Sequence, residues 1–258
     1  MNNNKNLKEI CENLIDTFLI AGKRSIELRK IGLIKKIKSD NTPVTNADLE
    51  VNEIITKKIK NLTPDIPIVS EESESNKSNN NLNNFWLIDP IDGTYDYVNN
   101  KDEFTLNAGL IINREAELGI NYAPAKKRLF FSYGNGNSFE LSNQRKIKLI
   151  CKKQTKNNQI KAVSYSQKLK PVIENFYKKL GVTEHTKMKS SLKFCVIATG
   201  EFDLYVAEPR ASEWDIAAGH AILKNAGGIV TDFDGNNITY GKKDFKNPSL
   251  ILKRGNNL

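Results

Sequence analysis

The chain has 258 residues, of which 39% are hydrophobic and 27% charged, and no apolar run reaches the roughly 18 to 20 residues that span a bilayer. The N-terminus, MNNNKNLKEI, lacks the features of a signal peptide, so we expect a cytoplasmic protein, with peripheral membrane association left open. A net charge of +9 suits a small anionic partner, and because no basic run carries interleaved aromatic residues, a nucleic-acid polymer is not expected.

The first half of the chain combines two helices with a run of strands. Apolar positions spaced three and four apart predict an amphipathic helix over residues 7–31, and Asn46 is the expected N-cap of a second helix that ends before TPDIP. The segment IVSEES (68–73) is typical of a strand running into a turn. The polar segment 73–84 is expected to form a mobile surface loop. Strands of a mostly antiparallel sheet are then predicted at 85–89, 104–112, 116–124, 128–134 and 138–142.

A segment rich in Lys, Asn and Gln, residues 145–160, predicts a boundary between an N-terminal lobe (1–145) and a C-terminal lobe (146–258). Beyond it, helices and strands alternate. Helices are expected at 170–180, 191–199 and 213–226, and strands at 160–166, 203–207, 228–235 and 249–253. Helices before and after the sheet indicate the α+β class, built from stacked layers.

Acidic residues stand close to several predicted element ends: Asp48, Glu71, Glu72, Asp89, Asp92 and Asp215. Asp48 and Asp215 have a milder interpretation, in which they complement a helix dipole, and the others could lie in solvated turns. Asp89 resists that interpretation, because it directly follows four apolar residues and a buried carboxylate needs a positive partner. If these groups converge, cations must offset their repulsion, and a site of oxygen donors suits Mg²⁺ or Mn²⁺ better than Zn²⁺.

The segment DPIDGT (89–94) adds a seat for an anion. Asp89 and Asp92 can face the same ions while the Ile91 carbonyl supplies another oxygen. Gly93 and Thr94 then open a short predicted helix, whose free backbone N–H groups can receive a phosphate oxygen. Metals beside an anion seat point to phosphoryl chemistry.

Four segments resemble the signatures of the inositol monophosphatase superfamily, in the same order: VTNAD (44–48), SEES (70–73), DPIDGT (89–94) and SEWDIAAGHAIL (212–223). Residues 190–228 most resemble the 3'(2'),5'-bisphosphate nucleotidase branch, which acts in sulfur metabolism on adenosine 3',5'-bisphosphate (PAP). The resemblance implies a layered α/β/α/β/α sandwich. It also implies a hydrolase that uses two or three Mg²⁺ ions, or Mn²⁺, to activate water, forms no covalent intermediate and is inhibited by Li⁺.

The same resemblance assigns roles to individual residues. The implied metal ligands are Glu71, Asp89, the Ile91 carbonyl, Asp92 and Asp215. Asp48 and Thr94, with Glu71, are the implied catalytic residues, since a hydroxyl relayed to a carboxylate can orient and deprotonate water. The implied substrate contacts are Asp92, Gly93, Thr94, Gln167, Ser190, Lys193 and Asp215. The segment DFDGN (232–236) resembles other phosphatase and calcium motifs, but we interpret it as a hairpin turn.

The chain departs from the nucleotidase pattern in three places. Lys189 stands where the branch has a Gly before Ser-Ser, Gln167 replaces the His of an SRSH segment, and YDY (95–97) replaces KEF. The metal motifs are intact, so these departures concern only the substrate. PAP is the leading prediction, an inositol or other sugar phosphate is the alternative, and a non-catalytic anion-binding protein is a distant third. Either a monomer or a homodimer fits the sequence.

Cys11, Cys151 and Cys195 form no CxxC pair and are expected to be reduced thiols of the core. None has an arginine six residues later, as a phosphatase with a catalytic cysteine would require. Two isolated histidines, His185 and His220, do not indicate a phosphohistidine enzyme, and we expect His220 to be structural.

Overall fold

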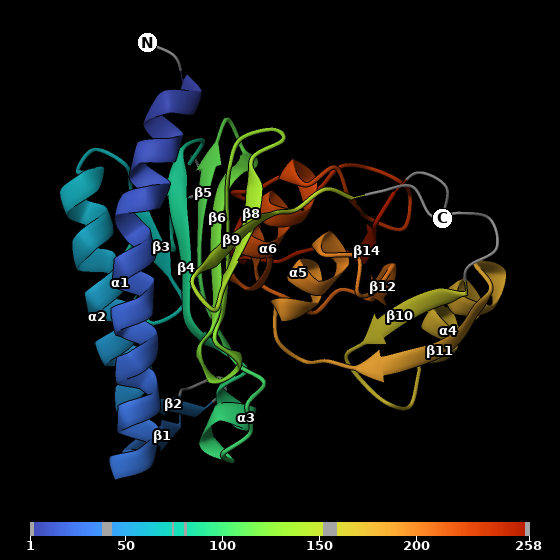
Figure 1. Cartoon of the computed structure of the whole chain (residues 1–258), viewed down its shortest axis with the longest axis horizontal. Coiled ribbons are helices and arrows are strands. Elements are labelled where there is room, and N and C mark those ends of the chain that lie inside the picture. The colour runs from blue at the N-terminus through green and yellow to red at the C-terminus, as the bar shows by residue number, and fades with distance from the viewer. Residues whose placement is uncertain (1–2, 38–42, 74, 80–81, 152–158, 256–258) are drawn as a thin grey trace.

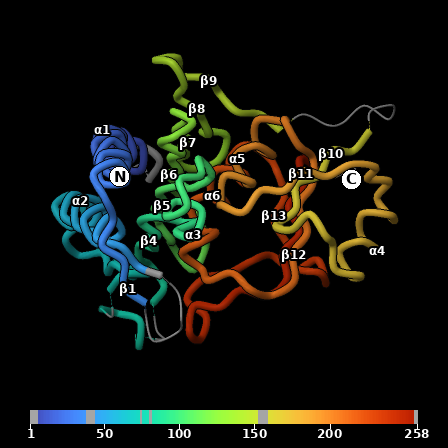
Figure 2. Tube along the Cα trace, turned by 90° about the horizontal axis from the view of Figure 1, so that it is seen from below, coloured from blue at the N-terminus to red at the C-terminus, as the bar shows by residue number. Residues whose placement is uncertain are grey.

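The computed structural model describes residues 3–37, 43–73, 75–79, 82–151 and 159–255. The described elements stack in five layers, in the order helices, sheet, helices, sheet and helix (Figures 1 and 2). The α/β/α/β/α sandwich predicted for this α+β protein is therefore confirmed. Among these residues, no helix combines the length and apolar character needed to cross a membrane.

Two long helices form the outer layer on one side, α1 (Asn3–Ile31) and α2 (Asn46–Leu62), with a short antiparallel pair, β1 (Lys35–Ile37) and β2 (Pro43–Thr45), between them. The N-cap of α2 is Thr45, so the prediction of Asn46 was wrong by one residue. The Thr45 side chain accepts hydrogen bonds from two backbone N–H groups of the first turn. The Asn46 side chain instead accepts from the Ile34 backbone N–H, at 2.9 Å.

The first sheet has seven strands in sequence order, and only its first pair is parallel. The strands are β3 (Ile68–Ser70), β4 (Phe85–Asp92), β5 (Thr105–Ile112), β6 (Glu115–Ala123), β7 (Arg128–Tyr133), β8 (Ser138–Ser142) and β9 (Arg145–Lys148). A short helix, α3 (Thr94–Val98), follows β4, and a 3-10 turn, η1 (Pro124–Lys126), precedes β7. Strand β9 was not predicted. It begins at residue 145 and so crosses the proposed boundary, and the division into lobes remains a prediction.

The middle layer holds α5 (Leu192–Ala198) and α6 (Glu213–Asn225), as predicted from the sequence. The second sheet follows, in the order β11-β10-β12-β14-β13, and α4 (Pro171–Lys179) covers its far side. Its strands are β10 (Ile160–Ser164), β11 (Val182–Lys187), β12 (Leu204–Ala207), β13 (Ile229–Thr231) and β14 (Leu250–Lys253). A 3-10 turn, η2 (Lys243–Phe245), precedes β14. The segment DFDGN forms a turn, in which the Gly235 N–H donates to the Asp232 carbonyl.

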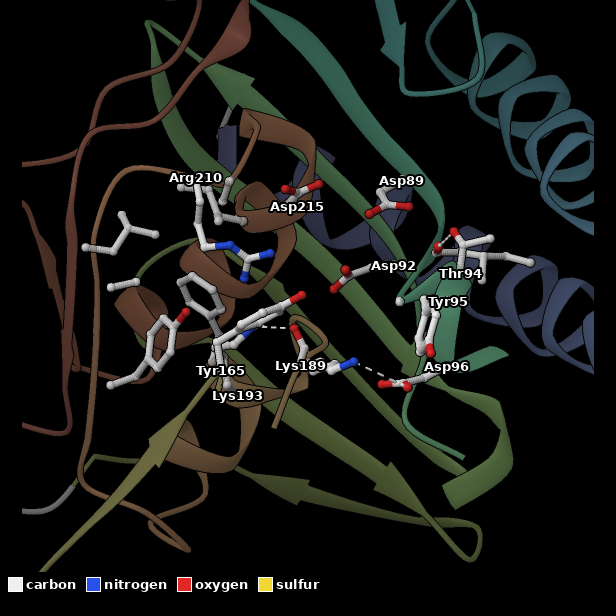
Figure 3. Close-up of a pocket in the computed structure, with 18 of the residues that line it drawn as sticks. Asp89, Asp92, Thr94, Tyr95, Asp96, Tyr165, Lys189, Lys193, Arg210 and Asp215 are labelled. Carbon is white, nitrogen blue, oxygen red and sulfur yellow. Dashed lines mark hydrogen bonds and ion pairs between the residues drawn. The ribbon is translucent and has the colours of Figure 1, made fainter. Parts of the chain in front are cut away.

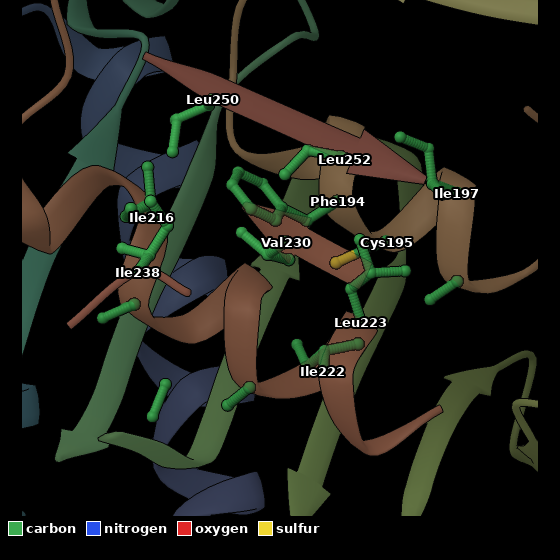
Figure 4. Close-up of a cluster of buried hydrophobic side chains, with 14 of the residues drawn as sticks. Phe194, Cys195, Ile197, Ile216, Ile222, Leu223, Val230, Ile238, Leu250 and Leu252 are labelled. Carbon is green, nitrogen blue, oxygen red and sulfur yellow. The ribbon is translucent and has the colours of Figure 1, made fainter. Parts of the chain in front are cut away.

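Helix α6 contacts both sheets and belongs to the largest hydrophobic core, part of which Figure 4 shows. Its approach to the first sheet is unusually close, because two strand glycines leave room for it. A Cβ atom on Gly109 would lie 2.7 Å from the Ala217 Cβ, and one on Gly119 would lie 2.2 Å from the Ala218 carbonyl oxygen. This packing sets the N-terminus of α6, with Asp215 in its first turn, beside the end of β4.

Candidate active site

The two aspartates at the end of β4 both line one cavity, which has a volume of about 510 Å³. In a regular strand, residues three apart point to opposite faces. Here the pairing with β5 shifts register between Asp89, which pairs with Asn107, and Asp92, which pairs with Thr105. This bulge around Pro90 allows both side chains to reach one cavity.

Three carboxylates meet at one wall of this cavity, and Figure 3 labels two of them, Asp89 and Asp215. Glu71 follows β3, the parallel neighbour of β4, Asp89 lies in β4, and Asp215 lies in the first turn of α6. One carboxylate oxygen from each lies within 4.8 Å of the others. Glu72 is not part of this group and does not line the cavity, so the structure places the first glutamate of the pair where the sequence predicted a ligand.

Burial gives this cluster a strong need for positive charge. The Asp89 side chain is 1% exposed, and its Oδ1 atom has no hydrogen-bond partner. Burial raises the pKa of Asp89 well above its ordinary value, and the charges of Glu71, Asp92 and Asp215 raise it further. Burial, with the charges of Asp92 and Glu71, likewise raises the pKa of Asp215 to about 8. A divalent cation would supply the missing charge and use the free oxygen, and oxygen donors of this kind suit Mg²⁺.

Asp92 stands between this cluster and the opposite wall (Figure 3). One of its carboxylate oxygens accepts a short hydrogen bond from the Ser191 backbone N–H. Burial raises its pKa, whereas the Lys193 charge and the bonds from Ser191 lower it. Asp92 is therefore held by the segment that leads into α5 as well as by its own strand.

A second feature links Asp48 to Thr94. The Thr94 hydroxyl lies 3.3 Å from Asp48 Oδ1 and 3.0 Å from the Ile91 carbonyl oxygen, so it can donate to either. The other Asp48 oxygen accepts from the Thr45 N–H at 2.7 Å and the Thr45 hydroxyl at 2.6 Å, and these bonds fix the carboxylate at the start of α2. Burial raises the pKa of Asp48 despite the bonds from Thr45, which makes it a better proton acceptor.

Gly93 makes the tight turn between β4 and α3 possible. Its φ of 92° is in the left-handed region, and a Cβ atom would lie 2.9 Å from the Glu103 carbonyl oxygen. Gly93 and Thr94 line the cavity beside the carboxylates, as expected for a phosphate seat.

Cations and aromatic rings gather on the other side of the cavity. Lys193 is buried, and its ammonium donates to the carbonyls of Lys189 (2.9 Å) and Ser190 (2.6 Å). Burial lowers its pKa to about 8, although the Asp92 charge opposes this. The Arg210 guanidinium lies 3.4 Å from the centre of the Tyr165 ring. The cavity is also lined by five residues to which no sequence motif assigned a role: Tyr95, Tyr165, Lys189, Tyr205 and Arg210.

Two predicted substrate contacts do not line this cavity. Gln167 is exposed, and its carbonyl oxygen lies 3.0 Å from His185 Nε2, so the structure does not bring it to the cavity wall that its neighbour Tyr165 helps to form. Ser190 is fully buried behind the wall, and its hydroxyl has no hydrogen-bond partner. Resemblance to the nucleotidase motifs therefore did not show whether the side chains of Gln167 and Ser190 face the cavity.

The histidine and the cysteines that were expected to be structural do not line the cavity. His220 is buried in α6, and its Nδ1 atom lies 2.8 Å from the Tyr240 hydroxyl, in keeping with a structural role. The cysteines Cys11, Cys151 and Cys195 are all free. Cys11 and Cys195 are fully buried.

Comparison with known proteins agrees with this site. A family model described as the inositol monophosphatase family matches residues 7–256. The 3'(2'),5'-bisphosphate nucleotidase CysQ of Buchnera aphidicola subsp. Acyrthosiphon pisum is 37% identical over 205 residues, which cover 79% of this chain and 76% of that protein.

Solved structures share the fold over nearly the whole chain. The crystal structure of CysQ from Bacteroides thetaiotaomicron has a TM-score of 0.76 and 27% identity, covering 94% of this chain and 96% of that one. An IMPase/NADP phosphatase complexed with Mg²⁺ and phosphate has a TM-score of 0.79 at 19% identity, covering 96% and 91% of the two chains. The chain thus belongs to the inositol monophosphatase family, a family of phosphatases.

Proposed function

We propose that the protein is a Mg²⁺-dependent nucleotidase that removes the 3'-phosphate of PAP to give AMP and phosphate. One observation carries the proposal: a single cavity joins a carboxylate cluster, centred on the buried Asp89, on one wall to cations and aromatic rings on the other. The first wall suits a metal-bound phosphate, and the second suits the remainder of an anionic, aromatic substrate. The names of the CysQ relatives support the same substrate.

The carboxylates of Glu71, Asp89, Asp92 and Asp215, with the Ile91 carbonyl, would hold Mg²⁺. When bound, Mg²⁺ would lower the pKa of the attacking water and neutralise charge on the phosphate. The orphaned Asp89 oxygen and the raised pKa values of Asp89 and Asp215 support this assignment. Whether two or three ions are used, and whether Mn²⁺ can replace Mg²⁺, are open parts of the proposal.

Asp48 and Thr94 would prepare the attacking water. When the Thr94 hydroxyl donates to Asp48 Oδ1, 3.3 Å away, its oxygen can accept a hydrogen bond from the water and fix one lone pair toward phosphorus. The proton that the water loses can then pass through the hydroxyl to the Asp48 carboxylate. Gly93 and Thr94 would seat the phosphate oxygens with their backbone N–H groups.

The alternative is an inositol or other sugar monophosphatase of the same family. Values of kcat/KM for PAP and inositol 1-phosphate, measured with the same enzyme preparation in Mg²⁺, separate the two. We expect PAP to be preferred by at least tenfold, and a tenfold preference for inositol 1-phosphate would overturn the proposal.

A non-catalytic anion-binding protein is the distant alternative, and Asp92→Asn tests it. We expect this variant to lose nearly all Mg²⁺-dependent turnover and to keep the fold, because the substitution removes one charge from an oxygen donor of the proposed metal site. Asp234→Asn, in an exposed turn, is the matched control and should be fully active. Unchanged turnover in Asp92→Asn would refute the assignment of this site.

Inhibition by Li⁺ is a further part of the proposal, since the resemblance of the sequence motifs to the family implies it. Turnover of PAP in Mg²⁺ should fall when millimolar LiCl replaces NaCl, and an unchanged rate would contradict it. A role in sulfur metabolism and a cytoplasmic location remain predictions. The protein is also predicted to act as a monomer or a homodimer.

A further inference from the structure

Lys189 lines the cavity and reaches from the segment before α5 to α3 (Figure 3). Its ammonium nitrogen lies 4.8 Å from the centre of the Tyr95 ring and 3.6 Å from Asp96 Oδ1. Its backbone N–H donates to Glu103 Oε1 at 2.9 Å, which anchors the main chain on the same side. A cation from one part of the chain is thereby fixed beside the residues that follow the phosphate seat.

This contact joins two of the departures from the nucleotidase pattern. The motif of that branch has a lysine at position 95 and a glycine at position 189, whereas this chain has Tyr95 and Lys189. In the structure the Lys189 ammonium lies over the Tyr95 ring. The positive charge missing at position 95 is thus supplied from position 189.

The charges around Lys189 leave its ammonium able to bind a ligand. Asp96, whose side chain is 4% exposed, accepts a hydrogen bond from Lys101 Nζ at 3.1 Å. The 3.6 Å between Asp96 and Lys189 exceeds hydrogen-bond length. The Lys189 side chain is 21% exposed and lines the cavity, whereas that of Lys101 is 56% exposed and does not. Lys101 therefore supplies the hydrogen bond to Asp96. Lys189 lines the cavity as the ion-pair neighbour of Asp96, and its N–H donors make no hydrogen bond to that carboxylate.

The position of Lys189 favours an anion other than the phosphate that is cleaved. Figure 3 places Asp89 and Asp215 on one side of Asp92, and Lys189 with Asp96 on the other. A phosphate held by the carboxylate-bound ions and Thr94 would lie on the first side. A second anionic group of the same substrate, extending past Asp92, would meet Lys189.

We propose that Lys189 is a specificity-determining residue that binds the 5'-phosphate of the nucleotide, the phosphate that is not cleaved. The proposal rests on the proposed function, since it requires a substrate with two phosphates. Tyr95 and Asp96 position the ammonium, and Lys189 takes no part in the chemical step.

The test compares PAP with adenosine 3'-phosphate, which carries the same scissile bond and lacks the 5'-phosphate. In Lys189→Met, kcat/KM for PAP should fall about tenfold or more, chiefly through KM, because one charge-assisted contact is lost. For adenosine 3'-phosphate it should fall less than twofold. By calorimetry, the Kd for 5'-AMP should rise by a similar factor of about ten, while that for adenosine stays unchanged.

Three further variants make the result specific to the charge. Lys189→Arg should keep most of the preference for PAP. Adding Tyr95→Lys to Lys189→Met moves the cation back to position 95, and should restore kcat/KM for PAP at least threefold. Lys101→Met is the matched control, since it removes the other cation beside Asp96, and should leave both substrates within twofold. Melting temperatures identify any variant that fails to fold.

The failures of the two proposals can be told apart. If the wild-type enzyme hydrolyses inositol 1-phosphate and ignores PAP, the proposed function fails. If PAP is the substrate and Lys189→Met lowers kcat/KM equally for PAP and adenosine 3'-phosphate, or lowers it for neither, the role of Lys189 is overturned and the proposed function stands. Loss of PAP selectivity in Lys101→Met as well would assign the effect to Asp96 instead.

Discussion

Gly119 of β6 lies directly against Ala218 of α6, so that a Cβ atom on the glycine would stand 2.2 Å from the alanine carbonyl oxygen. The obstacle is backbone, which cannot rotate away as a side chain can. The separation of α6 from the first sheet is thereby fixed, and with it the distance between Asp215 and the carboxylates at the end of β4. Packing of a residue outside the cavity therefore sets the geometry of the metal-binding wall.

Gly119→Ala should accordingly lower both stability and activity. Overpacking of this kind costs about 1–3 kcal/mol, and displacement of α6 would move Asp215 away from Asp89. Thermal melting and kcat for PAP measure the two effects. Gly255→Ala is the matched control, because a Cβ atom there meets nothing within 4 Å. A Gly119→Ala protein as stable and active as wild type would show that α6 can shift freely.

Thr94→Ala should lower kcat by about 10²- to 10⁴-fold, because the attacking water loses the hydroxyl that connects it to Asp48. KM should change less than threefold, since the backbone N–H groups that seat the phosphate remain. Thr94→Ser, which keeps the hydroxyl, should retain most of the activity. Steady-state kinetics on PAP decides the matter: a Thr94→Ala enzyme with wild-type kcat would exclude the hydroxyl from the reaction.

Removal of Mg²⁺ should destabilise the protein more at pH 8 than at pH 5. The pKa of Asp215, about 8 in the folded state, exceeds the value of about 3.9 expected when unfolded, so the folded protein binds more protons across this window. Its stability without metal must then fall as the pH rises from about 4 to 8. Mg²⁺ replaces those protons, so the gain in melting temperature from MgCl₂ over EDTA should be larger at pH 8.

Asp89→Asn should lose most of this Mg²⁺-dependent gain, and Asp234→Asn should keep it. If MgCl₂ raised the melting temperature of the wild-type protein equally at pH 5 and pH 8, protons and Mg²⁺ would not compete for the carboxylate cluster.

His220 should make the protein sensitive to acid. Burial, with the charges of Lys224 and Lys242, lowers its pKa from 6.5 to about 3. Below about pH 6.5 the unfolded chain therefore binds a proton at His220, whereas the folded chain does not bind it until the pH is near 3. The stability contributed by neutral His220 is consequently lost as the pH falls from about 6.5 toward 3. His220→Asn should be less stable than wild type at pH 7, and this deficit should shrink by roughly 2 kcal/mol between pH 6 and pH 4.

Urea unfolding of both proteins at pH 4, 5 and 6 measures this difference. A deficit that is independent of pH would mean that His220 is protonated equally in the folded and unfolded states.

The sequence was most informative where the site is built from contiguous residues. The segment DPIDGT predicted Asp89, Asp92, Gly93 and Thr94, because the turn that fixes their geometry lies within the motif. The contact between Lys189 and Tyr95 could not be predicted, because it depends on how α5 and α3 are placed by the tertiary fold. Each residue was noticed only as a departure from a pattern.

Local structure was missed where no buried face exists to leave a pattern. Strands β9 and β11 lie at the edges of their sheets, and every described residue of β9 is exposed. Alternation of apolar and polar residues appears only when one face of a strand is buried. The N-cap of α2 was misplaced for a different reason, since Thr45 and Asn46 are adjacent and both are good capping residues.

The carboxylate cluster draws Glu71 and Asp89 from the first half of the chain and Asp215 from its last fifth. During synthesis, the ribosome releases the first two long before the third exists. The growing chain therefore cannot assemble the full set of metal ligands until α6 has emerged and docked between the sheets. Tight binding of Mg²⁺ would thus mark the end of folding. A prematurely terminated chain would contain Glu71 and Asp89 but lack Asp215, and so could not form the complete metal site.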